Sequence, residues 1–320
     1  MSESAIEKQS CPICGGVGQF SFTSADLLTG LPGDFRYDAC TECGALYQAP
    51  TPTMEQIASF YPQEYSPFKP GKAKERNAIE RSVLRSCYGY RQLEGGLPDG
   101  LAALLGRFFY RDFIPFVADG RLLDIGCGGG KYLLSMRHMG WQGEGVELNE
   151  QAVEACRQSG LEVFHGELAD AAYMDNSFDL VTARHVIEHI PDLNPFIAEI
   201  FRVVKPGGLM VLRTPNSAAL GRGWFGTNWF ANEVPRHLTL FSEKNLEYLA
   251  VQHGFRQVVA KTFTTPKIIL NSWDYLVGNR PESSKRRKLH RLVARIYVTM
   301  AALSGRGDEL FMIFEKPKEH

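Results

Sequence analysis

Short apolar runs alternate with longer amphipathic stretches through the last two thirds of the chain. The runs are bounded by turn-forming residues, as buried strands are, and the stretches between them repeat apolar residues at helical spacing. We expect strands at 122–125, 143–148, 161–164, 177–182, 209–213, 254–262 and 308–316. This alternation predicts an α/β fold with helices on both faces of a largely parallel sheet, whose last two strands pair antiparallel at an edge.

The first 50 residues differ from the rest because they carry two cysteine pairs. Cys11 and Cys14 form one C-x2-C pair, and Cys40 and Cys43 form the other. Two such pairs complete a tetrahedral zinc site that has no open position and is therefore structural. The intervening residues fit a short β-hairpin. We expect a small zinc ribbon over 1–50, with four unrelated thiols or a redox pair as the alternative.

Residues 51–118 are expected to form a helical connector or cap. Thr53 can cap a short helix that runs to about Phe60. The segment 72–91 has the pattern of a second helix, and 101–117 has that of a third, which is rich in aromatic residues. The third helix either packs plainly on the main domain or covers its active site.

A glycine-rich segment follows the first expected strand, within a domain expected over 119–320. Gly126, Gly128 and Gly130 allow the backbone to pass close to a ligand. A dinucleotide fingerprint needs its third glycine where Lys131 stands, so the spacing disfavours an NAD-linked oxidoreductase. Asp124, two residues before the first glycine, suits a ligand with a cationic amino group better than a pyrophosphate.

The string Leu-Asp-Ile-Gly-Cys-Gly-Gly-Gly at 123–130 resembles motif I of class I S-adenosylmethionine (SAM)-dependent methyltransferases. The resemblance implies a Rossmann-like seven-stranded methyltransferase sheet and SAM as the cofactor. It implies that Glu147 binds both ribose hydroxyls, as an acid at the end of a second strand does, and that Glu167 and Leu168 lie beside the adenine. The implied cofactor-binding residues are Asp124, Gly126, Cys127, Gly128, Gly130, Glu147, Leu148, Glu167, Leu168 and Arg184.

The pattern P-x-H-L-x-x-F-S at 235–242 resembles a subgroup that includes quinone-biosynthesis O-methyltransferases and enzymes of polysaccharide and secondary-metabolite pathways. A ribbon joined to this domain resembles sugar-modifying methyltransferases. These resemblances imply methyl transfer to a hydroxyl or carbon of a small metabolite, with a sugar or nucleotide sugar as the expected acceptor.

A hydroxyl acceptor needs a general base, and histidine is suited to that role near neutral pH. Three histidines follow expected strand ends. We rank His189 first, because the adjacent Glu188 completes a Glu-His pair that the subgroup often carries, then His237 and His185. A packing or hydrogen-bonding role is the alternative for each histidine.

The segment 266–305 is expected to be an insertion of two helices between the last two strands. Seven basic residues lie between 280 and 295, opposed only by Glu282. Such a helix can be a solvated helix packed on the domain, can bind the phosphate of a nucleotide sugar or lipid-linked acceptor, can contact a membrane peripherally through 280–303, or can bind RNA.

Composition limits the remaining functions. The 44% apolar fraction supports a sizeable core, and a net charge of −1 makes a nucleic acid an unlikely partner. We see neither a secretory signal nor an apolar run of about 20 residues in the sequence. Seven cysteines in a chain that is not exported argue against a disulfide framework, so we expect a cytoplasmic protein. Two alternatives stay open: an RNA methyltransferase that binds through the ribbon and the basic insertion, and a non-catalytic SAM-binding interaction protein.

Overall fold

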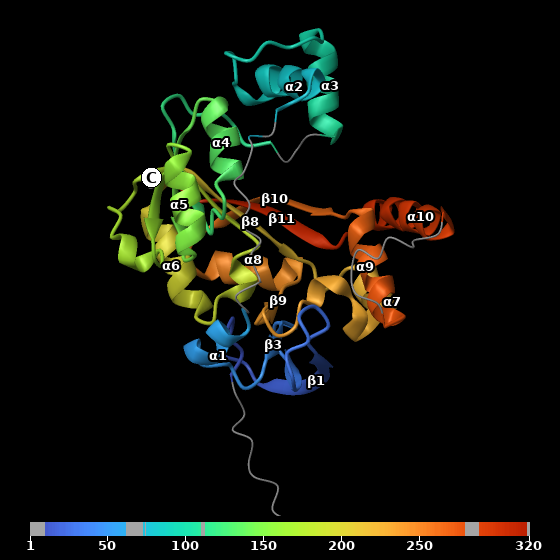
Figure 1. The fold of residues 1–320 in the computed structure, drawn as a ribbon. Helices are drawn as coiled ribbons and strands as arrows, with labels where there is room; N and C mark the ends of the chain where they lie inside the picture. Colours follow the sequence, from blue (N-terminus) through green and yellow to red (C-terminus); the bar gives the residue numbers. More distant parts are fainter. Residues whose placement is uncertain (1–9, 62–72, 74, 110–112, 279–287, 319–320) are drawn as a thin grey trace, which may run out of the picture.

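The computed structural model describes residues 10–61, 73, 75–109, 113–278 and 288–318. Its larger sheet has seven strands in the order β10-β11-β8-β7-β4-β5-β6 (Figure 1). Their bounds are β4 (Arg121–Ile125), β5 (Gln142–Glu147), β6 (Glu162–His165), β7 (Phe178–Arg184), β8 (Val204–Pro215), β10 (Arg256–Phe263) and β11 (Glu309–Glu315). All seven expected strands are present, and the predicted α/β fold is confirmed.

The strand order places the glycine loop at the centre of the sheet. β4 pairs in parallel with β5 and with β7, so Asp124 lies between Gly145 and Thr182. β11 runs antiparallel between β8 and β10. The last two strands therefore pair antiparallel at one edge of the sheet as expected, with β10 outermost and β11 inside it, where Met312 and Phe314 are fully buried. Ligands of open α/β sheets bind at the carboxyl edge, where the loop after β4 lies.

Helices bury both faces of this sheet. The bounds are α1 (Met54–Ser59), α2 (Ala78–Tyr88), α3 (Asp99–Phe109), α4 (Lys131–His138), α5 (Glu150–Gln158), α6 (Leu193–Val203), α7 (Leu220–Phe225), α8 (Glu243–Gln252), α9 (Pro266–Leu276) and α10 (Lys288–Ser304). Short 3-10 helices are η1 (Ala169–Ala171), η2 (Ile187–His189), η3 (Gly226–Asn228) and η4 (Phe230–Asn232). Because neighbouring strand residues point to opposite faces, Leu123 packs with α6 and α8, while Leu122 packs with α2, α4 and α5.

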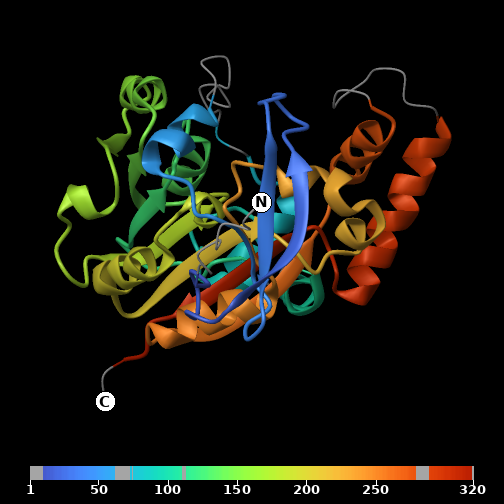
Figure 2. The same cartoon turned by 90° about the horizontal axis from the view of Figure 1, so that it is seen from below.

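The N-terminal residues form a smaller sheet whose last strand comes from the far end of the chain. Its strands, in order, are β1 (Gly18–Ala25), β2 (Asp34–Cys40), β3 (Leu46–Gln48) and β9 (Thr239–Leu240). The hairpin expected between the cysteine pairs is β1 with β2, seen in blue in front of the larger sheet in Figure 2. Ile13 and Tyr47 share a buried cluster with Leu193 of α6, so the ribbon packs directly on the main domain.

Several local expectations differ from the structure at their ends. Thr53 caps α1 with a capping box as expected, and Ser242 does the same for α8. The helix expected over 72–91 begins only after its cap at Asn77, and α3 does not continue to 117. β8 begins at Val204, earlier than the strand expected at 209–213, and Gly207 N–H donates to Lys316 O. A local cap at Asn77 sets the start of α2, whereas a long-range hydrogen bond holds the early part of β8.

The two helices α9 and α10 lie between β10 and β11, at the positions expected for the insertion. They pack on each other and on α7 through Ile269, Tyr297 and Ala301, and stand at one side of the molecule (Figures 1 and 2). Of the helices within the described ranges, none has both the length and the apolar character needed to cross a bilayer. Residues 279–287, which hold much of the basic run, lie outside the described residues.

Candidate functional site

The loop after β4 is held tightly by its neighbours. Gly126 (φ +62°) and Gly130 (φ +73°) lie in the left-handed region that favours glycine. A Cβ on Gly126 would lie 2.5 Å from Val186 Cγ2, and one on Gly130 would collide with Leu161. The contact with Val186 places the glycine loop directly against the segment that follows β7.

Asp124 lies at the base of this loop, where both carboxylate oxygens have protein partners. The side chain is fully buried; its Oδ1 accepts a hydrogen bond from Thr182 Oγ1 at 2.5 Å, and its Oδ2 lies 3.3 Å from Arg184 Nη2. The Arg184 guanidinium stacks 3.8 Å from the centre of the Tyr132 ring. Asp124 thus orients Arg184, and its direct contact with a ligand ammonium stays a prediction.

Arg184 retains one unused donor. Its Nε is buried and has no hydrogen-bond partner among the described residues. A buried donor without a partner is costly, and a ligand carboxylate beside the loop would remove that cost. SAM carries such a carboxylate on its methionine part, so this donor fits the expected cofactor.

Glu147 ends β5 with its carboxylate turned toward the loop. Its Oε2 accepts a hydrogen bond from Gly128 N at 2.8 Å, and its Oε1 accepts one from Asn149 N at 2.9 Å. A carboxylate oxygen has two lone pairs, so each oxygen can accept one more bond. The residue is therefore fixed in place and still able to receive two ribose hydroxyls.

The other expected cofactor residues lie around the same edge. Leu148 is 65% exposed and offers an apolar surface of the kind on which an adenine ring packs. Glu167 is exposed and Leu168 is buried just before η1. The Cys127 side chain packs beneath the loop, 2.7 Å from where a Cβ on Gly145 would be, so only its backbone faces a ligand.

Three polar side chains converge beside the loop. Glu188 and His189 belong to η2, and His237 belongs to the segment before β9. One nitrogen or carboxylate oxygen of each lies within 4.8 Å of the others, a spacing that would also suit a divalent cation. The two imidazole rings meet edge to face with centroids 4.8 Å apart. We call these three residues the acceptor-side cluster.

Backbone carbonyls define which nitrogen of each imidazole carries the proton. His189 Nδ1 lies 2.9 Å from Arg236 O, and His237 Nδ1 lies 3.0 Å from Ala231 O. A carbonyl oxygen only accepts, so these bonds require a proton on Nδ1. The Nε2 atom of each neutral ring then carries a lone pair, which is the form that a general base needs.

The cluster combines an anionic carboxylate with a neutral imidazole. Glu188 is fully buried and accepts a hydrogen bond from Thr214 Oγ1 at 2.9 Å. Burial opposes its charge, but the hydrogen bond and positive charge of His185 lower the pKa of Glu188 to about 2. Burial lowers the pKa of His237 to about 4, although Glu233 acts in the opposite direction. A negative charge therefore lies beside a ring that stays uncharged at neutral pH.

A family model for a methyltransferase domain matches residues 91–260, which is more than half of the chain. The chain belongs to this methyltransferase family. The matched range contains the glycine loop, Glu147, Glu188, His189 and His237, so both parts of the candidate site lie inside it.

Curated relatives of this methyltransferase include ubiquinone biosynthesis O-methyltransferases. One from Xanthomonas oryzae pv. oryzae is 35% identical over 129 residues, which cover 38% of this chain and 54% of the relative. One from Brucella anthropi is 32% identical over 165 residues, which cover 48% of this chain and 66% of the relative. The chain thus spans about half to two thirds of the length of these relatives.

Solved structures of methyltransferases are also similar to this chain. A SAM-dependent methyltransferase from Archaeoglobus fulgidus has a TM-score of 0.46 and 19% identity, covering 73% of this chain and 98% of that chain. A SAM-dependent methyltransferase from Methanosarcina mazei has a TM-score of 0.44 and 18% identity, and the match covers 64% of this chain and 95% of that chain.

The third histidine expected in the methyltransferase site lies at its margin. His185 is 45% exposed; its Nδ1 is 3.4 Å from Glu188 Oε1 and its Nε2 is 3.6 Å from Glu309 Oε1. Although burial lowers it, these carboxylates raise the pKa of His185. The structure thus groups His189 with His237, while His185 balances the charge of Glu188.

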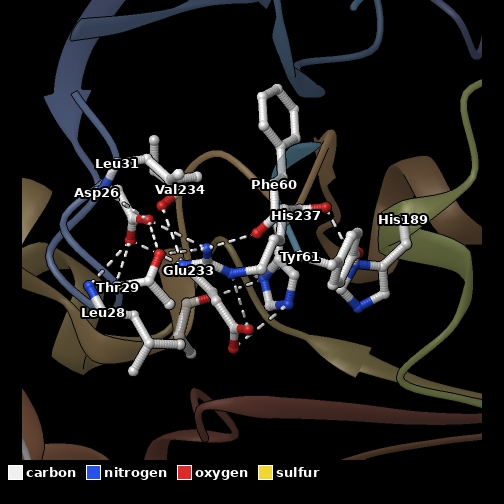
Figure 3. A network of polar contacts seen from close by, with 12 residues as sticks. Asp26, Leu28, Thr29, Leu31, Phe60, Tyr61, His189, Glu233, Val234 and His237 are labelled. Atoms are coloured by element: carbon white, nitrogen blue, oxygen red, sulfur yellow. Dashed lines mark hydrogen bonds and ion pairs between the residues drawn. The ribbon is translucent and has the colours of Figure 1, made fainter. Parts of the chain in front are cut away.

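Four residues of this methyltransferase site were missed by sequence reasoning. Tyr61 Oη lies 2.9 Å from His189 Nδ1, and the buried Arg236 binds Asp26 and approaches Glu233. Figure 3 shows Asp26, Tyr61 and His189 in one polar network. Asp26 and Arg236 are 210 residues apart, so no local pattern connects them. The only local signal is an Asp between two apolar residues, Ala25 and Leu27.

The paired cysteines form a compact cluster. Cys11 Sγ lies 3.6 Å from Cys43 Sγ, and Cys14 Sγ lies 3.4 Å from Cys40 Sγ, with all four sulfurs within 4.8 Å of one another. Four sulfurs at about 2.3 Å from one zinc ion are roughly 3.8 Å apart in a tetrahedron. Burial raises the pKa of Cys40, but backbone N–H donors, among them Glu42, lower it to about 7. The donor set and its spacing fit a closed zinc site.

Proposed function

We propose that this methyltransferase transfers a methyl group from SAM to a hydroxyl of a small-molecule acceptor. The observation that carries the proposal is the pair of Nδ1-protonated imidazoles, His189 and His237, beside the buried carboxylate of Glu188. This cluster adjoins the glycine loop through Val186. The curated relatives named O-methyltransferases support a hydroxyl acceptor over a carbon acceptor.

The chemistry divides between cofactor and protein. SAM supplies a methyl group on a sulfonium, so transfer breaks a C–S bond, forms a C–O bond and releases the hydroxyl proton. His189 Nε2 accepts that proton as the general base, and the Glu188 carboxylate stabilises the resulting imidazolium. His237, kept neutral by burial, accepts a hydrogen bond that orients the acceptor.

We assign cofactor binding to the loop after β4 and its neighbours. With SAM bound, the backbone at 126–130 would lie against it, Glu147 would accept hydrogen bonds from the ribose hydroxyls, Leu148 would pack on the adenine and Arg184 Nε would donate to the carboxylate. The acceptor-side cluster, which SAM binding alone does not require, argues against a non-catalytic SAM-binding protein. We further propose that the four paired cysteines hold structural zinc.

The acceptor class is tested with a panel. Phenols and catechols, nucleotide sugars and RNA are each incubated with protein and labelled SAM, and methylated product is measured by mass spectrometry. We expect a phenolic or sugar hydroxyl to be methylated. A sugar or nucleotide sugar as the acceptor and a cytoplasmic location stay predictions, and RNA stays the alternative substrate. Methylation of RNA alone would contradict the small-molecule proposal.

The base is tested with matched histidine variants. His189→Gln is expected to lower kcat by roughly 10²–10⁴-fold, with unchanged SAM affinity by calorimetry. His253→Gln, at the C-cap of α8, is the control and is expected to retain kcat. Full turnover in both His189→Gln and His237→Gln, with SAM still bound, would show that the base assignment is wrong.

We also propose peripheral membrane contact through α10. Its exposed apolar residues recur at helical spacing, with exposed arginines beside them: Leu292, Ile296, Met300 and Leu303, flanked by Arg291 and Arg295. The segment 288–304 has no acidic residue, and such a helix binds anionic interfaces. Sedimentation with phosphatidylglycerol vesicles, lost in high salt and in Arg291→Gln/Arg295→Gln, is the expected result. If the protein self-associates, as measured by ultracentrifugation, and does not sediment with the vesicles, the proposed membrane contact is wrong.

A further inference from the structure

We propose that the N-terminal ribbon is part of the acceptor site, because its Asp26 positions Arg236 and thereby sets the proton of His189 on Nδ1. Asp26 and Arg236 are positioning residues: neither touches the acceptor, and both act through His189. The catalytic consequence rests on the proposed function, in which His189 is the base, whereas the positioning itself does not.

The Arg236 side chain is completely buried among acceptors from the N-terminal part of the chain. Its Nη2 donates to Asp26 Oδ1 at 2.8 Å, and its Nη1 lies 3.1 Å from Asp26 Oδ2. The same Nη1 lies 3.2 Å from Thr29 Oγ1 and 3.2 Å from Phe60 O. Figure 3 shows Asp26, Thr29 and Phe60 around this guanidinium. Three separate places in residues 26–60 therefore fix one side chain.

This ion pair fixes the position of the Arg236 side chain more than it adds to the unfolding free energy. Removing two charges from water costs as much as their attraction returns, so a buried pair by itself is weak evidence for stability. The guanidinium is a rigid planar fork, and a carboxylate that binds both of its arms fixes its orientation. Asp26 is itself immobilised by accepting bonds from the backbone N–H groups of Leu28 and Thr29. The ribbon therefore fixes the position and orientation of the Arg236 guanidinium.

The backbone of Arg236 carries this placement to the base. Its carbonyl oxygen accepts the hydrogen bond from His189 Nδ1 at 2.9 Å. The following residues are held from both sides: Tyr37 Oη donates to His237 O at 2.6 Å, and Leu238 N donates to Glu188 O at 2.7 Å. The segment 236–238 thus connects the ribbon to η2 with no intervening element.

A competing partner makes the position of this carbonyl decisive. Tyr61 Oη also lies 2.9 Å from His189 Nδ1, and a hydroxyl can either donate or accept. While the Arg236 carbonyl is in reach, Nδ1 must carry the proton and Nε2 keeps its lone pair. If that carbonyl moves away, Tyr61 can donate to Nδ1 and the ring proton moves to Nε2. The base is then lost without loss of the imidazole.

The test measures the tautomer directly in the full-length, zinc-loaded protein. Long-range ¹H–¹⁵N spectra of ¹⁵N-histidine-labelled protein distinguish the two tautomers, and His189→Gln assigns the His189 signals. Asp26→Asn leaves the buried guanidinium uncompensated and nearly preserves the shape. The matched control is Asp38→Asn, which removes an ion pair of the same ribbon (Arg36 Nε to Asp38 Oδ1, 2.7 Å) whose two side chains make no hydrogen bond or ion pair with the described residues 236–238.

We expect the wild type and Asp38→Asn to show His189 protonated on Nδ1. In Asp26→Asn the Nε2-protonated form appears, kcat falls by at least about tenfold, and the Kd for SAM stays within about twofold. Adding Tyr61→Phe to Asp26→Asn removes the competing donor, so the Nε2-protonated form is expected to decrease relative to Asp26→Asn alone and part of kcat to return. A purely structural defect would not be rescued by a second deletion.

An unchanged His189 tautomer in folded Asp26→Asn would overturn the proposal, whatever the turnover. A changed tautomer with unchanged kcat would support the positioning and refute the proposed base. Should Asp26→Asn fail to fold, Arg236→Lys retains the charge without the fork and is expected to give the same tautomer change. A wild-type tautomer in that variant would equally overturn the proposal.

Discussion

Replacing Gly126 by alanine tests whether the cofactor loop and the acceptor-side cluster share one packed boundary. Gly126 has φ +62°, and a Cβ there would lie 2.5 Å from Val186 Cγ2. Val186 immediately precedes η2, which carries Glu188 and His189. Relief of the clash therefore requires either a shift of the loop or a shift of the cluster.

The magnitude follows from two separate costs. A left-handed alanine costs about 1–2 kcal/mol. Carbon atoms ordinarily approach to about 3.5–4.0 Å, so Val186 must move by about 1 Å, at an overpacking cost of about 1–3 kcal/mol. We expect Gly126→Ala to lose about 2–5 kcal/mol of unfolding free energy. A 1 Å displacement of the base is expected to lower kcat by roughly 10²-fold.

Urea unfolding and steady-state kinetics check these values. Adding Val186→Ala to Gly126→Ala removes Cγ2. We expect the double variant to regain the unfolding free energy lost to overpacking and most of kcat, but not the part lost to the left-handed backbone at position 126. Gly223→Ala is the control, because Gly223 lies in α7 with no heavy atom within 4 Å of its Cβ position. Wild-type stability and kcat in Gly126→Ala would refute the packed boundary.

Three further predictions follow from the site. One zinc ion per chain is expected by metal analysis, and Cys40→Ser is expected to lose it and several kcal/mol of unfolding free energy, unlike Cys87→Ser at an exposed thiol outside the cluster. The Arg236 guanidinium and Thr29, against the effect of burial, lower the pKa of Asp26 from 3.8 to about 2. Above pH 4 the fold therefore favours the ionised over the protonated Asp26 carboxyl by about 2 kcal/mol, and this preference is lost as pH falls from 4 to 2. The difference in unfolding free energy between wild type and Asp26→Asn should change over that range, and a constant difference would contradict this. His237→Gln is expected to raise KM for the acceptor more than it lowers kcat, and the reverse ratio would show that His237, not His189, removes the proton.

Local chemistry explains why much of this fold could be predicted. The strand before Gly126 and the cap at Thr53 depend on neighbours in sequence, and the structure confirms them. The cysteine pairs likewise predicted a cluster, because a C-x2-C turn brings two sulfurs together by itself. The cofactor roles of individual residues such as Asp124 stay predictions.

Long-range pairing explains what was not predicted. The two-residue strand β9 is too short to show an alternating pattern, and its partner β3 lies about 190 residues earlier. β11 pairs on its other side with β8, which lies about 100 residues earlier in the chain. Tyr61 reaches His189 only because the ribbon docks where it does. Such residues can be found only when the whole chain is folded.

The participation of β9 in the ribbon sheet also has a consequence for synthesis. During translation β3 emerges with its outer edge unpaired, and Thr239 follows about 190 residues later. At 5–20 residues per second this delay is roughly 10–40 s. An open strand edge is a site of pairing with other chains, so the nascent ribbon is exposed to aggregation throughout that interval. Zinc held by the four paired cysteines would order β1 to β3 early but would leave this edge open until β9 arrives.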